Sequence, residues 1–239
     1  MDIHLTLFGD IVLTPTLVTS LIVIALLMLF FIICGIIINK ADPTKPSKGL
    51  MAVLEIAYNG VEGFIRDSVG DKAAKYIPFI FTVASYLVLA NLMGLFGFLP
   101  PTTEFSITLS LTIVTLTYIL LAGIIAKGFG GYLKDTYLGN TPWPMWFLFV
   151  PINIIGELSK IISLSFRLFG NIMSGALLLG LVLQLFRWLI DLMPAIGWLS
   201  ALILPFLNAY FDIFAGLMQA FIFCTLTMVF IKGATEREV

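Results

Sequence analysis

Charged side chains are scarce in this sequence, and residues that build metal sites or disulfides are scarcer still. Of its 239 residues 11% are charged and 60% are apolar, with a mean hydropathy of +1.08. Soluble domains carry about 25% charged residues, so an ordinary soluble fold is excluded. A net charge of −1 without a basic cluster argues against a nucleic-acid partner. The single histidine, His4, and the cysteines Cys34 and Cys224 show no metal-ligand spacing, so no metal or cofactor is expected.

The apolar residues gather in runs long enough to cross a bilayer, which takes about 20 residues of helix. We therefore predict an all-α polytopic membrane protein in which residues 1–239 form a single integral membrane domain. Five membrane-embedded helices are expected, at 12–38, 77–99, 105–126, 151–186 and 198–231, with an interfacial amphipathic helix at 49–75.

The interfacial helix is predicted from periodicity. Leu50, Leu54 and Val61 recur at helical spacing, opposite Glu55 and Glu62. This pattern is typical of a helix that lies flat at the membrane surface. An ordinary soluble hairpin element is the alternative.

Basic residues indicate which loops face the cytoplasm. They follow the first span (Lys40, Lys45 and Lys48), flank the glycine-rich turn at 128–131 (Lys127 and Lys134) and lie after the last span (Lys232 and Arg237). The connection between the second and third spans holds Glu104 and no basic residue. We therefore expect the N-terminus outside and the C-terminus in the cytoplasm.

The last two helices are too long to stand upright in a membrane. Residues 151–186 number 36 and residues 198–231 number 34. Fully helical, each would be roughly 50 Å long, against a hydrocarbon core of about 30 Å. Because this pair also carries most of the intramembrane charges, we predict two strongly tilted helices packed as a hairpin, with a protein partner or water covering the polar face.

An arginine lies in the middle of the first of these long helices. Ser163, Arg167, Asn171 and Ser174 follow one another at helical spacing and form a polar stripe, which Lys160 extends. A guanidinium at mid-bilayer depth costs between about 2.5 and about 17 kcal/mol, so it must face protein or water. The stripe indicates either a functional site or a structural pairing of Arg167 with a buried carboxylate.

The final helix carries a matching stripe. Asn208, Asp212, Gly216 and Gln219 fall on one face. A carboxylate at such depth either pairs with a cation or takes up a proton and can then relay protons. Gln219 can hydrogen-bond across a helix contact, which suggests a pairing with Arg167. In the alternative interpretation, Asp212 is a loop residue hydrated by water.

The motifs Leu164-Ser-Phe-Arg-Leu-Phe-Gly-Asn171 and Leu217-Met-Gln-Ala-Phe-Ile-Phe223 resemble subunit a of the F-type rotary ATP synthase, in its bacterial form. Pro151-Ile-Asn153 and Glu157 add to the resemblance. The N-terminal half is similar in layout, including the interfacial helix after the first span.

This resemblance implies a non-catalytic stator subunit in the plasma membrane that couples proton or sodium flow to ATP synthesis. Arg167 would face the carboxylates of a rotating c-subunit ring, between two offset half-channels. The resemblance further implies contacts with the b subunit of the peripheral stalk, with other ATP synthase subunits and with membrane lipid. The ion path would comprise Arg167 with Asn171 and Gln219 positioning it, Asp212 and Glu104 on the outer side, Glu157 and Lys160 on the inner side, and Ser163, Ser174 and Asn208 along the stripes.

One departure from the family pattern affects the outer side. Many bacterial members carry a glutamate directly after the glycine that ends the arginine motif, paired with a histidine on the last helix. Ala176 and Asp212 stand at those places here. We predict that the titratable group of the outer half-channel has moved to Asp212.

Two other classes of protein are weighed against this interpretation. A secondary transporter could bind an anionic solute at Arg167, but the sequence shows no internal repeat or pair of broken helices. An intramembrane enzyme would need a catalytic motif such as His-Glu-x-x-His or Gly-x-Ser-x-Gly, and the sequence has neither.

Overall fold

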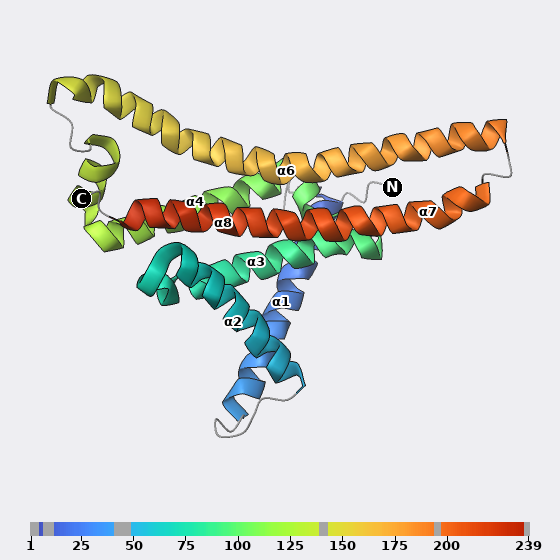
Figure 1. Cartoon of the computed structure of the whole chain (residues 1–239), viewed down its shortest axis with the longest axis horizontal. Helices are drawn as coiled ribbons and strands as arrows, with labels where there is room; N and C mark the ends of the chain where they lie inside the picture. The colour runs from blue at the N-terminus through green and yellow to red at the C-terminus, as the bar shows by residue number, and fades with distance from the viewer. Residues whose placement is uncertain (1–4, 7–11, 41–48, 139–142, 194–196, 237–239) are drawn as a thin grey trace.

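The computed structural model describes residues 5–6, 12–40, 49–138, 143–193 and 197–236 (Figure 1). Lys45, Lys48 and Arg237, which contribute to the predicted orientation, lie outside these residues. Short strands β1 (Leu5–Thr6) and β2 (Val12–Leu13) pair antiparallel ahead of the helices. The helices are α1 (Pro15–Lys40), α2 (Leu50–Val69), α3 (Ile77–Leu92), α4 (Phe105–Lys127), α5 (Phe129–Leu133), α6 (Trp146–Leu192), α7 (Gly197–Tyr210) and α8 (Gly216–Thr235). Shorter turns are η1 (Gly70–Lys75), η2 (Met93–Phe96), η3 (Pro101–Thr103), η4 (Lys134–Leu138), η5 (Trp143–Met145) and η7 (Phe211–Ala215).

Five helical segments of the described chain are long and apolar enough to cross a membrane. They are Pro15–Asn39, Ile77–Phe96, Phe105–Lys127, Trp146–Leu192 and Gly197–Thr235. The predicted all-α polytopic membrane class is therefore confirmed. The only strands described are the two-residue β1 and β2, which the sequence did not predict.

The two C-terminal segments form the long hairpin that their lengths predict. α6 has 47 residues and is therefore roughly 70 Å long, while Gly197–Thr235 has 39 residues. They lie lengthwise beside each other, and α1 and α2 project from them at a steep angle (Figure 1). α6 begins at Trp146, before the expected start at residue 151, because Pro151 is accommodated inside its N-terminal end. As the sixth residue of the helix, Pro151 removes one backbone hydrogen bond, the one that its N–H would have made to the Phe147 carbonyl.

The core surrounds α8, which packs against α3, α4 and α2. Ile80, Met228 and Ile231 belong to one buried cluster, in which α2 takes part through Ile65. Phe223 and Leu168 belong to a second cluster that joins α8 to α6. Inside a membrane such contacts stabilise by close packing rather than by exclusion of water. The packed core therefore holds α6 and α8 against each other around Leu168 and Phe223.

Hydroxyl groups buried in α4 are satisfied within their own helix. Thr108 and Thr112 are completely buried, and Thr112 Oγ1 donates to the Thr108 carbonyl at 2.9 Å. Thr115 bonds in the same way to the Leu111 carbonyl at 2.9 Å. These backbone-directed bonds remove the cost of burying the hydroxyl groups.

Candidate functional site

Arg167 lies in an open groove of about 720 Å³ between α6 and the α7–η7–α8 rod. We call it the Arg167 groove, and its polar lining residues are Arg167, Asn171, Ser174, Tyr210 and Gln219. The Arg167 side chain is exposed, and it forms no ion pair with a carboxylate in the described part of the chain. A structural pairing with a buried carboxylate of this chain, the alternative left open above, is therefore not observed among those residues.

The groove floor is tied together by amides rather than by the arginine. Asn171 Nδ2 donates to Gln219 Oε1 at 3.3 Å, which joins α6 to α8. Gln219 is only 1% exposed, and its Nε2 has no partner within the described residues. Arg167 and Gln219 line the same groove, but no hydrogen bond joins them among the described contacts. The rest of the stripe, Ser163 and Ser174, is exposed.

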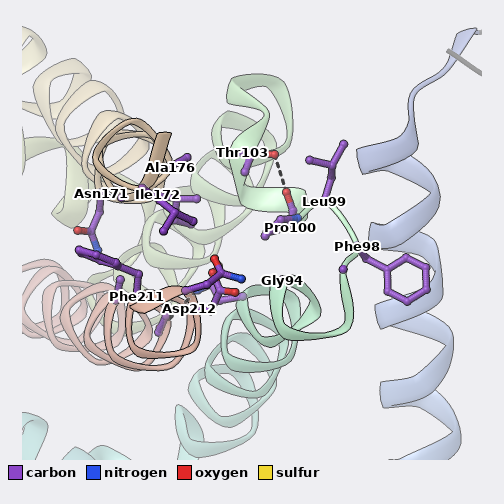
Figure 2. Close-up of a pocket in the computed structure, with 17 residues that line it drawn as sticks. Gly94, Phe98, Leu99, Pro100, Thr103, Asn171, Ile172, Ala176, Phe211 and Asp212 are labelled. Atoms are coloured by element: carbon purple, nitrogen blue, oxygen red, sulfur yellow. Dashed lines mark hydrogen bonds between the residues drawn. The ribbon is translucent and has the colours of Figure 1, made fainter. Parts of the chain in front are cut away.

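Asp212 lines a second, smaller cavity of about 270 Å³ (Figure 2). We call it the Asp212 cavity. Its walls come from α3 with η2, from the 97–103 connection, from α6 and from the α7–η7–α8 rod, and they include Asn91, Gly94, Thr103, Asn171, Ala176, Asn208 and Asp212. Asp212 is the one titratable side chain among the described residues that line it. Ala176 faces the same space, so the two positions that depart from the family pattern lie in one cavity.

Asp212 belongs to a π-helical turn, η7, inserted between α7 and α8. Such turns are single-residue insertions that interrupt the regular i to i+4 hydrogen bonding and occur frequently at functional sites. Asn208, Asp212 and Gly216 nevertheless line the Asp212 cavity together, as the sequence stripe predicts, whereas Gln219 lines the Arg167 groove.

The two spaces share a wall. Asn171, Gly175, Phe211 and Ala215 line both the Arg167 groove and the Asp212 cavity. Arg167 lines only the groove, and Asp212 lines only the cavity. These four residues therefore lie between the two spaces.

Glu104 lies apart from Asp212, at the N-terminal end of α4. It does not line the Asp212 cavity, although its neighbour Thr103 does. Its carboxylate accepts hydrogen bonds from Thr16 Oγ1, from Thr14 Oγ1 at 3.0 Å and from Ser106 Oγ at 2.9 Å. These bonds, that of Thr16 first, hold the pKa of Glu104 below its ordinary value.

Glu157 and Lys160 pair with each other near the start of α6. Lys160 Nζ lies 2.6 Å from Glu157 Oε1, and it also lies 5.3 Å from the ring centre of Phe230 on α8. Tyr132 of α5 is close by: burial raises the pKa of its hydroxyl, and the negative charge of Glu157 adds to the rise. Neither residue lines the Asp212 cavity. The pair precedes Arg167 on α6, whereas the residues of α6 that line the cavity follow Arg167.

Sequence analysis missed three residues of the Asp212 cavity region, Asn91, Gly94 and Thr102. Asn91 is 4% exposed, and its Oδ1 accepts a hydrogen bond from Thr102 Oγ1 at 2.7 Å. An amide inside the apolar run 77–99 was the available signal. Gly94 carried no signal, because its role depends on which residue faces it.

The fold and the site define a class: a multi-pass membrane protein whose two longest helical segments line a cavity with one carboxylate, beside a groove whose arginine has no ion-pair partner among the described residues. Residues 17–232 match the family described as "ATP synthase A chain". The chain belongs to this family. It is thus a membrane-sector, non-catalytic subunit that acts within an ATP synthase complex.

Curated relatives agree with this assignment. "ATP synthase subunit a" of Helicobacter pylori is 34% identical over 215 residues, which are 89% of this chain and 87% of the relative. "ATP synthase subunit a 2" of Acaryochloris marina is 33% identical over 194 residues, 81% of this chain and 74% of the relative. "ATP synthase subunit a" of Helicobacter hepaticus is 37% identical over 188 residues, 78% and 76% respectively. The transporter and intramembrane-enzyme alternatives are set aside by this family membership.

Proposed function

We propose that this chain is the ion-translocating stator of the ATP synthase membrane sector and that Arg167 is its essential charge. In this proposal the Asp212 cavity is the inner end of an outer half-channel. The Arg167 groove receives the carboxylates of a rotating c-subunit ring. Ion flow from one space to the ring, and from the ring to the opposite side, drives rotation and ATP synthesis.

The observation that carries the proposal is the arrangement of two opposite charges in adjoining spaces. Arg167 is exposed in an open groove without an ion-pair partner among the described residues, and Asp212 lies behind the shared wall of Asn171, Gly175, Phe211 and Ala215. A guanidinium at membrane depth without a carboxylate partner needs water or a polar group of another subunit beside it. Gly170 also lines the groove and has open space around it, so a partner helix can approach closely.

The mechanism follows from electrostatics. A ring carboxylate that reaches Arg167 is favoured in its ionised form, because two opposite unit charges 4 Å apart attract by about 4 kcal/mol at an effective dielectric of 20. The carboxylate therefore releases its ion before it passes. The same fixed cation repels a free ion, so the ion cannot pass directly between the half-channels.

The remaining predicted site residues have supporting roles in this proposal. Asp212, with Asn208 beside it, passes ions inward, and Glu104 lies at the outer approach, next to the cavity residue Thr103. Glu157 and Lys160 form the inner side of the path, toward the cytoplasm. The N-terminus lies outside, the C-terminus lies in the cytoplasm, the membrane is the plasma membrane, and the b subunit of the peripheral stalk binds this stator.

Replacement of Arg167 tests the proposal. In ATP synthase purified with this chain and reconstituted in liposomes, we expect Arg167→Ala to abolish ATP-driven ion pumping while the complex remains assembled. Arg187→Ala is the matched control, because Arg187 is an exposed arginine farther along the same helix. Pumping at the wild-type rate by the Arg167→Ala complex would refute the role assigned to Arg167.

A second experiment tests Asp212. Asp212→Asn keeps the shape of the side chain but removes its ability to carry a proton. We expect passive ion conduction through the membrane sector to slow by about 100-fold or more, the low end of what a positioned proton carrier contributes. Conduction at the wild-type rate would remove Asp212 from the path.

The coupling ion is a proton or a sodium ion. Dependence of ATP hydrolysis on sodium in the purified complex distinguishes the two, because only a sodium-coupled rotor needs that ion to turn.

A further inference from the structure

The carboxylate of Asp212 rests directly on Gly94 of η2, where no side chain intervenes (Figure 2). A Cβ placed on Gly94 would lie 2.8 Å from Asp212 Oδ2, 2.9 Å from Cγ and 3.0 Å from Oδ1. All three nearest atoms belong to that one carboxylate. The space that Asp212 occupies therefore exists only because residue 94 has no side chain.

The same two segments repeat this arrangement in the opposite direction. A Cβ placed on Gly216, the residue directly after η7, would lie 2.7 Å from Asn91 Cβ. Asn91 Nδ2 donates to the Gly216 carbonyl at 3.4 Å, while Thr102 Oγ1 holds the Asn91 amide oxygen. Each segment thus presents a polar side chain to a glycine of the other, Asn91 to Gly216 and Asp212 to Gly94. We call these four residues the glycine exchange.

From this geometry we propose that Gly94 and Asn91 are positioning residues for ion transfer. The glycine exchange holds the π turn η7 against α3 and η2. It thereby sets where the Asp212 carboxylate lies in its cavity. The inference rests on the function proposed above and deepens it, because it specifies what places the transferring group.

Substitution of Gly94 would act on Asp212 rather than on the backbone. Gly94 is not among the glycines with positive φ, so alanine fits its conformation. The atoms that must give way are the end of one side chain, which can rotate. We therefore expect Gly94→Ala to fold and to displace the carboxylate by several tenths of an ångström. Misplacement of a reacting group by about 1 Å can cost 100-fold, so about a tenfold slower transfer is expected.

The test measures passive ion conduction of the reconstituted complex as a function of pH. Asp212 is the one titratable group among the described residues that line its cavity. We expect Gly94→Ala to lower the maximal rate about tenfold and to shift the pH of half-maximal conduction, with normal assembly. Gly180→Ala on α6 is the control, because a Cβ there meets open space. An unchanged rate and pH profile in Gly94→Ala would overturn the proposal.

A second variant covers the case in which Gly94→Ala fails to assemble. Thr102→Val removes the hydroxyl that holds Asn91 without adding bulk, and we expect a smaller shift of the pH profile. No shift in this variant would overturn the role of Asn91.

A double substitution separates this inference from the proposed function. In Asp212→Ala the contacting carboxylate is gone, so adding Gly94→Ala is expected to cause no further loss of thermal stability or conduction. A further loss would show that Gly94 acts elsewhere. If Asp212→Asn alone conducts normally, the proposed function of Asp212 fails. If it slows conduction while Gly94→Ala does not, only the positioning role fails.

Discussion

Asn171 on α6 donates a hydrogen bond to Gln219 on α8 across the floor of the Arg167 groove, at 3.3 Å. The bond uses the acceptor of Gln219 and leaves its Nε2 buried without a partner in the described part of the chain. A buried donor left unpaired costs about 1–3 kcal/mol.

The Gln219 contact leads to the first prediction. We expect Gln219→Leu to slow ATP-driven pumping about tenfold, because it removes both the bond to Asn171 and the free donor while preserving bulk. Pumping is measured in liposomes against Gln184→Leu, which changes an exposed glutamine of α6. Equal rates in the two variants would contradict a role for Gln219 in the groove.

The second prediction concerns acid stability and Glu104. Its folded pKa lies below the unfolded value of about 4.3, so its hydrogen bonds stabilise the fold above that pH and lose this effect as the pH falls through the folded pKa. We expect Glu104→Gln to lower the thermal midpoint at pH 7 by a few degrees. The difference from wild type should shrink as the pH falls below about 4.

Thermal unfolding in detergent, followed by circular dichroism, measures this effect. Glu236→Gln is a suitable control, because Glu236 is exposed directly after α8. Its Oε1 lies 4.0 Å from Lys232 Nζ, too far for a hydrogen bond. A pH-independent difference between Glu104→Gln and wild type would show that the charge of Glu104 does not stabilise the fold.

The spans and the Arg167 stripe could be predicted because hydropathy and helical periodicity are local properties. Five apolar runs and one arginine among them are enough to locate α6 and to expose Arg167 as a candidate. The partners of Glu104 could not be predicted, because Thr14 and Thr16 lie 90 and 88 residues away in sequence. Only the packing of the chain brings them together.

The surroundings of Asp212 show the same limit. The stripe Asn208, Asp212, Gly216 and Gln219 assumed a regular helix, but a π turn occupies Phe211–Ala215. This turn packs against Gly94, and Gly216 directly after it packs against Asn91, so its neighbours come from a distant part of the sequence. The sequence therefore located the carboxylate but not the space that contains it.

The third prediction concerns the pair formed by Glu157 and Lys160. Both side chains are partly exposed, at 25% and 35%, so their attraction is expected to contribute no more than about 1 kcal/mol. In a double-mutant cycle of Glu157→Gln and Lys160→Met, we expect the combined change in conduction to be smaller than the sum of the two single changes. Strict additivity would show that the two groups act independently on conduction.

The last prediction tests the C-terminal end of α4, where Gly123 makes room for the buried ring of Tyr132. A Cβ on Gly123 would lie 2.5 Å from Tyr132 Cε2 and 3.2 Å from the Ala234 carbonyl of α8. We expect Gly123→Ala to destabilise the fold by about 1–3 kcal/mol, because both a ring and a backbone group would have to move. Gly233→Ala, which places a Cβ in open space on α8, is the control in thermal unfolding. If Gly123→Ala unfolds with the control, the packing of α5 against α4 is looser than these distances require.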